Sequence, residues 1–362
     1  MEYIVPEYYK HFVCKCGDCR KSCCDGWPIT ISQKEYYYLI GVACSDELRG
    51  KLDCALKLSP VRSTQSYAVL SGDWHGNCKL HLESGLCALQ TELGAEAIPA
   101  VCRLYPRSTK KLLRYCECSC SNSCEQVVEL LMDIHTPLRF EEVTLSQDPV
   151  FEFPLTHQNY ESFKHAISIM QNRSLSLGER FLSLHHELYG SIISSPSSDL
   201  SLAFQVVSDL TVSYENNETI CEYCRETLRY FGLDEDHRPE KDYLHLKEKY
   251  DAASCLIEKL LPDWPVLIEQ LLINHMIYND FIYTTPFDQG TDAYISLVLT
   301  YSFLRFHILG ILSNGILSSS LVDFLVSMFR LIDHSNFKSV AVALFKNRQL
   351  PAADAIAQLV FL

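Results

Sequence analysis

Cysteines are the residues of this chain whose number and placement most directly indicate chemistry. The chain has 17 of them, and all but Cys221, Cys224 and Cys255 lie between Cys14 and Cys124. Grouped thiolates bind zinc or iron–sulfur clusters, whereas in secreted proteins they usually pair as disulfides. The odd count, and the lack of a secretory signal at the start of the sequence, argue against a disulfide framework. We therefore expect the first third of the chain to bind metal.

The spacing of these cysteines is compatible with metal ligands carried by loops. Five of them fall within residues 14–24. Cysteines two to four residues apart in a loop can turn their sulfur atoms toward one ion, and Gly17 and Gly26 supply backbone freedom there. Single cysteines on separate segments follow, which suits a cluster buried between those segments.

Spacing alone does not distinguish zinc from an iron–sulfur cluster. Neither the C-x₂-C-x₂-C-x₃-C run of ferredoxins nor the C-x₃-C-x₂-C triplet of radical enzymes occurs in the sequence. Cys116, Cys118 and Cys120 alternate, so in a strand they would share one face, and small buried packing residues explain them as well as ligands do. Side chains of the adjacent pair Cys23 and Cys24 diverge in regular backbone, so one can bind metal while the other packs or serves a second centre.

Several stretches around these cysteines resemble the flagellin lysine-N-methylase family. The matching stretches are residues 6–14 (PEYYKHFVC), 19–31 (which contains CCDGWPITI), 86–94 (LCALQTELG), 102–107 (CRLYPR) and 123–125 (SCE). The C-terminal half is similar through residues 274–281 (NHMIYNDF) and 329–336 (FRLIDHSN). The likeness spans most of the chain, and its specific motifs lie in the cysteine-rich part.

This resemblance implies an enzyme that methylates flagellin lysine side chains, with S-adenosylmethionine as the methyl donor and a [4Fe-4S] cluster. It also places eight cysteines at the family's recurring metal positions, and these are Cys14, Cys19, Cys23, Cys24, Cys78, Cys87, Cys102 and Cys124. Two residues depart from the family's pattern, because Glu125 stands where a proline is usual and Asp333 where a glutamate is usual.

Two other functions are compatible with the same residues. One is a non-enzymatic zinc- or iron-binding protein that binds flagellin or another protein partner, and the other is an iron–sulfur redox protein. A glycine-rich strand–loop–helix segment would have indicated a nucleotide-type cofactor directly, and the sequence contains none. The expectation of S-adenosylmethionine therefore depends on the resemblance alone.

Three ionisable residues in the C-terminal half are candidates for acid–base chemistry. Lysine methylation requires a neutral amine, so a nearby group has to accept its proton. Asp280 lies five residues after His275 in a polar break of an apolar helix, and Asp333 and His334 follow another apolar run. A helix cap or a hydrogen-bonded core group would explain these residues equally well. We take Asp280, Asp333 and His334 as the candidate catalytic residues.

The pattern of apolar residues, glycine and proline predicts a mostly α-helical protein. We expect a cysteine-rich metal-binding domain with irregular loops over residues 1–136, a linker or irregular crossing over 137–162, and a helical domain over 163–362. The longest apolar stretch runs from Ala293 to Leu312 and contains Arg305 and His307. Such residues are rare at the centre of a membrane span, so we expect a buried core helix and no membrane span.

The charge of the chain restricts its partners. A formal net charge of −14 argues against a nucleic-acid binder, because phosphate neutralisation needs a basic surface. The same charge is compatible with a cationic substrate such as a lysine side chain. With no secretory signal expected, the chain should work in the cytoplasm.

Overall fold

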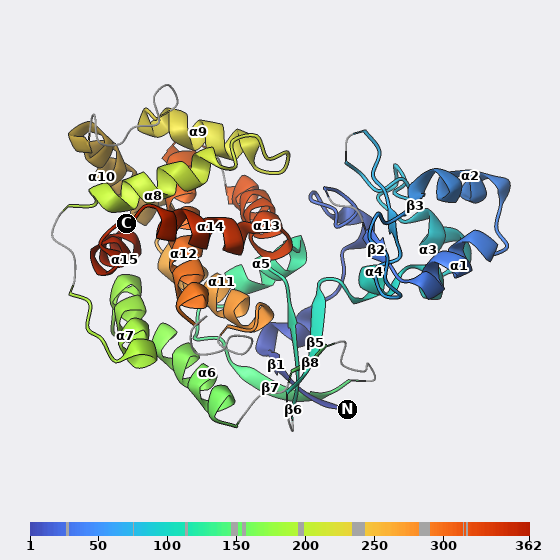
Figure 1. The fold of residues 1–362 in the computed structure, drawn as a ribbon, viewed down its shortest axis with the longest axis horizontal. Coiled ribbons are helices and arrows are strands. Elements are labelled where there is room, and N and C mark those ends of the chain that lie inside the picture. Colours follow the sequence, from blue (N-terminus) through green and yellow to red (C-terminus); the bar gives the residue numbers. More distant parts are fainter. Residues whose placement is uncertain are drawn as a thin grey trace. The chain divides into compact units, whose positions relative to one another are not determined.

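The protein is described by a computed structural model, which covers residues 1–26, 29–74, 76–112, 115–145, 151–153, 157–194, 199–233, 243–281, 290–313, 315 and 318–362. These residues form fifteen α-helices and eight short strands, which confirms the predicted mostly helical fold (Figure 1). The chain packs as two compact units. The helical unit consists of Met1–Phe12, Thr109–Ser123 and Val127–Leu362, and the cysteine unit of Val13–Ser108 and Cys124–Gln126.

The two units do not follow the boundaries expected from the sequence, which were 1–136, 137–162 and 163–362. Strand pairing explains the difference, because β1 (Glu2–Pro6) pairs in parallel with β6 (Tyr115–Cys120), far away in the sequence. Both strands therefore belong to the helical unit. The segment expected to be a linker contains β7 (Phe140–Thr144) and β8 (Phe151–Phe153), which are strands of the same sheet.

The sheet of the helical unit has five strands in the order β7-β1-β6-β5-β8, where β5 is Arg107–Leu112. Tyr3 and Val5 of β1 pack against Cys116 and Cys118 of β6 in a small buried cluster. Cys120 is also fully buried, so the three alternating cysteines pack as small apolar residues inside the helical unit.

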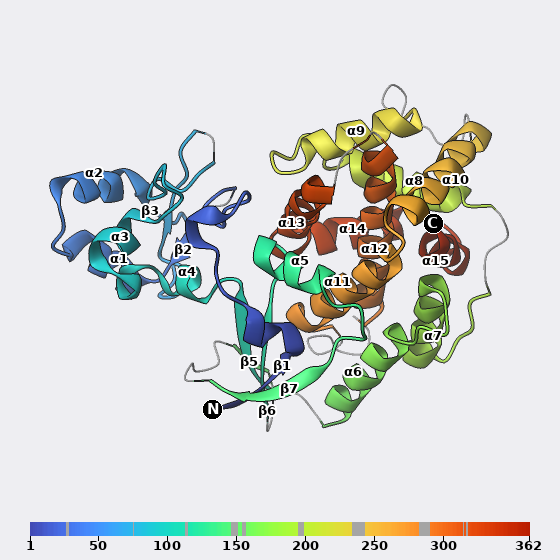
Figure 2. The ribbon, with the colours of Figure 1, turned by 180° about the vertical axis from the view of Figure 1, so that it is seen from behind.

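Ten helices follow the sheet in sequence. They are α6 (His157–Met170), α7 (Leu177–Tyr189), α8 (Ser201–Val212), α9 (Cys221–Phe231), α10 (Tyr243–Leu260), α11 (Trp264–Tyr278), α12 (Gly290–Ser313), α13 (Ser318–His334), α14 (Phe337–Asn347) and α15 (Ala352–Phe361). Helix α12 packs against α8, α9, α10, α14 and α15, and both views show it among these helices (Figures 1 and 2).

Helix α12 contains the apolar stretch singled out in the sequence. Its residues Thr291–Ser313 are long and apolar enough to cross a membrane, with a hydropathy of 1.7, and 94% of the apolar 18-residue window within them is buried by the protein itself. Arg305 stacks on Trp264 and donates a hydrogen bond to the Tyr250 hydroxyl at 2.8 Å. Helix α12 is therefore a buried core helix, as the sequence predicts.

The cysteine unit is built on a small antiparallel sheet. Its strands are β2 (Ile29–Ile31), β4 (Ala68–Leu70) and β3 (Leu56–Leu58), in that order across the sheet. Its helices are α1 (Gln33–Gly41), α2 (Asp46–Ala55), α3 (Ala88–Leu93) and α4 (Ala100–Leu104), and α5 (Glu125–Met132) begins in this unit and continues into the helical one. The remaining described residues are loops and short 3₁₀ turns, as expected for a metal-binding part.

Two loops of the cysteine unit touch through glycine backbones. A β-carbon on Gly17 would lie 2.6 Å from the carbonyl oxygen of Ser84, and one on Gly85 would lie 2.5 Å from the carbonyl oxygen of Gly17. Gly85 also has a left-handed φ of +78°. Only glycine permits both the approach and this backbone conformation. The loop with the first five cysteines is thereby held against the loop between Cys78 and Cys87.

A buried charge cluster lies in the helical unit where α11 ends. Asp280 follows α11 in the left-handed conformation, and Phe281 N–H donates to the Met276 carbonyl at 3.0 Å, as in a Schellman cap. The ammonium group of Lys110, on β5, donates to the carbonyls of Ile277 and Tyr278 and lies 2.5 Å from the Asp280 carboxylate. A cation suits the negative end of the helix dipole.

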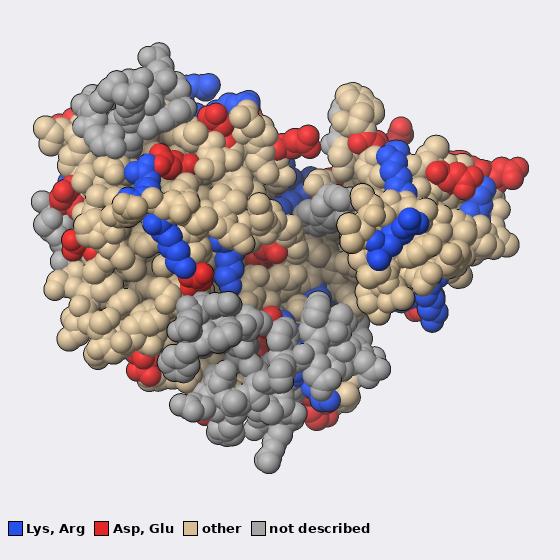
Figure 3. All heavy atoms as spheres, viewed as in Figure 1, with Lys and Arg blue, Asp and Glu red and all other residues tan. Residues whose placement is uncertain are grey.

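Charged side chains of both signs are scattered among uncharged residues on the described surface. On the face drawn in Figure 3, lysine and arginine residues are interspersed with aspartate and glutamate over each unit.

Replacing Gly17 by alanine should destabilise the cysteine unit, because the new methyl group overlaps the Ser84 carbonyl oxygen. Overpacking of this kind costs about 1–3 kcal/mol, measurable by urea unfolding. Gly50→Ala is the matched control, since Gly50 lies within α2 and its added β-carbon meets nothing within 4 Å. That variant should gain up to about 1 kcal/mol. Equal unfolding free energies for the two variants would contradict the backbone contact.

Glu117→Gln should make the protein more stable at pH 8 than the wild type. Burial raises the pKa of Glu117 to about 7. The positive charge of Lys110 opposes this rise, and the negative charge of Asp280 adds to it. The folded wild type therefore holds a proton that the unfolded chain releases above about pH 4.5, so its stability falls as the pH rises from there to about 7. The loss is up to about 3 kcal/mol, at roughly 1.4 kcal/mol per pH unit. Thermal unfolding at pH 5 and pH 8 tests this, and a variant with an unchanged pH dependence would refute it.

Candidate functional site

All eight cysteines predicted as metal ligands lie in the cysteine unit. Four of them form one neighbourhood, which we call the first cysteine group, and these are Cys24, Cys78, Cys87 and Cys102. Burial raises the pKa of the Cys102 thiol, and the neighbouring thiolates of the other three raise it further. Cys78 and Cys87 are in turn influenced by Cys24. Four segments of the unit thus bring their sulfur atoms near one another.

Backbone hydrogen bonds fix the loops of the first cysteine group. The N–H of Cys78 donates to the carbonyl of Cys24 at 2.7 Å, and Cys87 begins helix α3. Burial raises the pKa of Cys78 to about 11, and the nearby backbone N–H groups of Leu80 and His81 oppose the rise. The N–H groups of Leu89 and Gln90 in the first turn of α3 oppose the rise for Cys87 in the same way, without a capping hydrogen bond to its side chain. Such donors stabilise a thiolate, which is the form that binds metal.

The adjacent cysteines Cys23 and Cys24 differ in character. A hydrogen bond from Cys23 lowers the pKa of Cys24, burial opposes this, and the Ser22 hydroxyl and His81 add to the lowering. The same hydrogen bond raises the pKa of Cys23. The hydrogen bond between the two thiols thus favours ionisation of Cys24 over that of Cys23.

A second cysteine group, Cys14, Cys19 and Cys124, lies around the start of α5. Burial raises the pKa of Cys19 to about 12, and the charges of Glu125, Cys124 and Cys14 contribute.

Among all the residues that the structure describes, in both units, no three His, Cys, Asp or Glu side chains are arranged as a binding site for one metal ion.

Glu125 holds the loop of the second cysteine group in place. Its side chain is fully buried and accepts a hydrogen bond from the Lys15 ammonium at 2.8 Å. The backbone N–H groups of Arg20 and Lys21 donate to its other carboxylate oxygen at 2.8 and 3.1 Å. The residue that departs from the family's usual proline therefore ties the cysteine loop to the first turn of a helix.

A network of buried polar side chains lies in the helical unit, directly after β6. Ser121, Asn122, Ser123 and Asn274 are fully buried. The amide nitrogen of Asn274 donates to the carbonyl of Cys120 at 2.7 Å and to the Asn122 side chain at 2.6 Å. These bonds fix the end of the strand against α11.

Asp333 is the centre of this network. Its carboxylate accepts hydrogen bonds from the Ser121 hydroxyl at 2.8 Å and from the Asn279 amide at 3.0 Å, and it lies 2.9 Å from Nδ1 of His275. Burial tends to raise the pKa of Asp333, but His275, His334 and Ser121 more than offset it, so the pKa is lowered. Asp333 is therefore an ionised carboxylate inside the protein.

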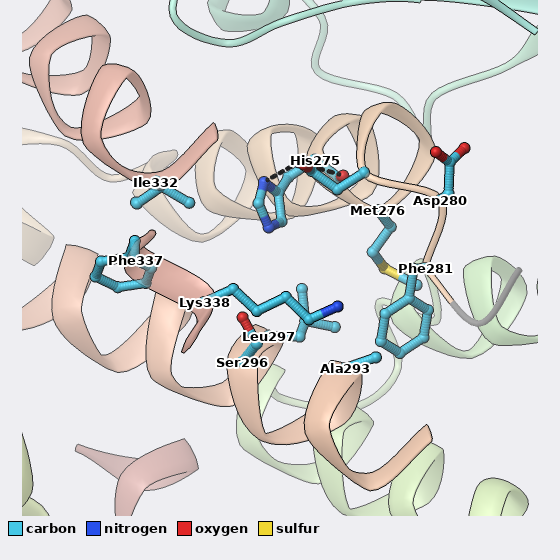
Figure 4. A pocket seen from close by; sticks show the side chains of 11 residues that line it. His275, Met276, Asp280, Phe281, Ala293, Ser296, Leu297, Ile332, Phe337 and Lys338 are labelled. Carbon is cyan, nitrogen blue, oxygen red and sulfur yellow. Dashed lines mark hydrogen bonds between the residues drawn. The ribbon is translucent and has the colours of Figure 1, made fainter. Parts of the chain in front are cut away.

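A cavity of about 210 Å³ lies beside His275, between α11, α12, α13 and α14. Its walls are mostly apolar and include Met276, Phe281, Leu297 and Ile332. The imidazole of His275 projects from α11 into this space (Figure 4).

The three predicted catalytic residues occupy different positions around this site. Asp280 lines the cavity, but its carboxylate points away from the centre, and its ion pair with Lys110 and its place in the helix cap give it a structural role (Figure 4). Asp333 lies behind His275. His334 is exposed, and its Nε2 is 2.7 Å from the Ser123 hydroxyl, which in turn contacts Ser121. The structure thus brings Asp333 and His334 into one network and places Asp280 in another.

His275 and the serines after β6 are the site residues that the sequence left unassigned. In the sequence, His275 lies near Asp280, five residues away. Its hydrogen-bond partner is Asp333, which is 58 positions further along the chain. A sequence pattern could have identified Ser121, Asn122 and Ser123 as site residues. They are three consecutive polar residues that directly follow a strand of buried alternating cysteines.

Comparison with known proteins agrees with the resemblance seen in the sequence. Residues 185–359 match the family model of the FliB lysine N-methylase C-terminal domain, and this range includes His275, Asp280, Asp333 and His334. The cysteines of both groups lie outside it.

Three proteins of Salmonella are among the relatives of the chain. Over 163 residues it is 26% identical to the lysine-N-methylase of Salmonella choleraesuis, covering 41% of this chain and 37% of that protein. The lysine-N-methylase of Salmonella typhimurium matches to the same extent. A flagellar biosynthetic protein FliU from Salmonella muenchen is 26% identical over 132 residues, 35% of this chain and 75% of that protein.

The matched region spans little more than a third of the length of each of the two methylases. No solved structure matches the chain. Residues 185–359 are thus similar to the FliB lysine N-methylase C-terminal domain, and part of the chain is similar to the lysine-N-methylases of Salmonella.

Proposed function

We propose that this protein is a lysine N-methyltransferase that transfers a methyl group from S-adenosylmethionine to lysine side chains of flagellin in the cytoplasm. The observation that carries the proposal is the match of residues 185–359 to the FliB lysine N-methylase C-terminal domain. The names of the relatives, lysine-N-methylase and flagellar biosynthetic protein, agree in pointing to lysine and to the flagellum. An acidic protein also suits a lysine-bearing substrate, since its net charge is −14.

The proposal includes a [4Fe-4S] cluster held by the first cysteine group. Its donor set fits such a cluster, because four cysteines from separate segments are neighbours and backbone N–H groups near Cys78 and Cys87 favour their thiolate forms. Cys24 has a lowered pKa, as expected of a ligand thiolate. When bound, the cluster would tie these four segments together.

The main alternative is a protein without enzymatic activity that binds flagellin, with zinc in place of the cluster as a purely structural metal. Four cysteine thiolates are also a common donor set for structural zinc. Metal content and methylation must therefore be measured separately.

Incubating the purified chain with flagellin and methyl-labelled S-adenosylmethionine should transfer label to lysine side chains, which peptide mass spectrometry locates. Flagellin whose lysine amines have been acetylated beforehand is the control and should remain unlabelled. A folded, metal-loaded preparation that leaves flagellin lysines unmodified would exclude the methyltransferase and favour the binding protein.

Cys102→Ser should abolish binding of the iron–sulfur cluster, because it removes one of the four ligands of the first cysteine group. Iron and sulfide content per chain, together with visible absorption, is the measurement. Cys54→Ser is the matched control, since Cys54 is an exposed thiol on α2 outside both groups, and it should retain full iron. Retention of full iron by the Cys102 variant would remove Cys102 from the ligand set, and bound zinc without iron in the wild type would refute the cluster.

A further inference from the structure

His275 has the arrangement of a side chain that can accept a proton. Its Nδ1 faces the ionised Asp333 carboxylate at 2.9 Å, and an ionised carboxylate needs a donor, so Nδ1 carries the hydrogen. The amide nitrogen of Asn279 lies 2.9 Å from the same Nδ1, and with the ring hydrogen on Nδ1 this amide donates to the Asp333 carboxylate and to the His275 carbonyl. The unprotonated nitrogen of the neutral ring is therefore Nε2, for which the described residues provide no hydrogen bond. An imidazole in this tautomer, oriented by a carboxylate, is suited to act as a general base.

Donors and acceptors can be assigned to all the hydrogen bonds of this network around Asp333 without conflict. His334 can donate to Ser123, Ser123 to Ser121, and Ser121 to Oδ2 of Asp333, while His275 donates to Oδ1. Each hydroxyl then donates once, and the Ser121 hydroxyl also accepts from the backbone N–H of Ser123 at 3.1 Å. This arrangement keeps the carboxylate ionised and the tautomer of His275 fixed.

The cavity in front of Nε2 suits an alkyl chain that ends in an amine. At about 210 Å³ it is smaller than the roughly 300–1,000 Å³ of sites for whole small molecules, so it suits a single side chain. Apolar residues such as Met276, Leu297 and Phe337 can contact methylene groups, and His275, Asn279 and Ser296 supply the polar groups.

The charged residues that line the cavity favour a neutral amine. Asp280 points away from the cavity and is ion-paired with Lys110 (Figure 4). Lys338, on α14, extends into the space between Leu297 and Phe281 (Figure 4). Its positive charge disfavours a bound ammonium ion relative to the free amine.

We propose that this cavity binds the lysine side chain that is to be methylated, and that Nε2 of His275 removes a proton from its ammonium group. Asp333 is a positioning residue that holds the imidazole. The N–H bond breaks and leaves its electron pair on nitrogen, which then bonds to the methyl carbon of a sulfonium donor. The carbon–sulfur bond breaks with its electron pair on sulfur, and the proton on His275 passes to water. This assignment rests on the proposed lysine methylation.

The binding part of the proposal is tested by NMR, without any methylation. Titration of the full chain, labelled with ¹⁵N at histidine, with N-acetyl-lysine amide should shift the imidazole resonances of His275. The fully buried His307 is the internal reference and should not move. In Asp333→Asn the ¹⁵N shifts should report a changed His275 tautomer, an effect that loss of packing alone would not produce. An unmoved His275 signal at saturating probe would overturn the site.

The chemical part is tested by kinetics on flagellin. Removal of a general base costs about 10²–10⁴-fold in rate, so His275→Ala should lower kcat by that factor with little change in KM, and added imidazole should restore part of it. His165→Ala, on the exposed face of α6, is the control and should keep full activity. A His275→Ala enzyme within threefold of wild type would overturn the proposal. If the wild type binds the probe at His275 but methylates nothing, the proposed function fails while the amine site stands.

Discussion

The helical unit depends on one buried carboxylate. Asp333 has no exposed side-chain surface, and an ion in that position costs several kcal/mol unless donors surround it. The donors come from two other elements, since Ser121 follows β6 and His275 and Asn279 belong to α11 and its end. Satisfying this charge therefore fixes the end of a strand, the end of α11 and the end of α13 relative to one another. The cavity beside His275 forms where these elements meet α12 and α14.

A comparable constraint organises the cysteine unit. Its loops have little regular structure, and they are positioned by backbone contacts and by a buried charge. Gly17 and Gly85 allow two loops to touch, and Glu125 gathers the N–H groups of Arg20 and Lys21 together with the Lys15 ammonium. The cysteines are thus brought together partly by interactions that involve no cysteine. A bound cluster would add to a framework that the chain already provides.

Features of the fold that depend on neighbouring residues could be predicted from the sequence. Apolar content identified α12 as a core helix despite Arg305 and His307, and the alternation of Cys116, Cys118 and Cys120 was compatible with one buried face of a strand, which the structure shows. The helix-cap alternative for Asp280 was also local, because a residue that follows a long apolar helix is placed to end it. In each case a few neighbouring residues contain the information.

Pairings between distant residues were not predictable in this way. The parallel pairing of β1 with β6 joins residues more than a hundred positions apart and assigns the N-terminal strand to the helical unit. The hydrogen bond between His275 and Asp333 joins two helices, and no local pattern distinguishes His275 from a core histidine such as His307. Site geometry of this kind arises from tertiary packing, which one sequence does not display.

The central claim is that the acceptor lysine lies in front of His275. A crystal structure of the full chain with a lysine-containing flagellin peptide tests it most directly. The account predicts a lysine side chain within the cavity of α11–α14, with its amine nitrogen at a hydrogen-bonding distance of about 3 Å from Nε2 of His275. A peptide bound with its lysine elsewhere, and the cavity filled by Lys338 alone, would contradict it.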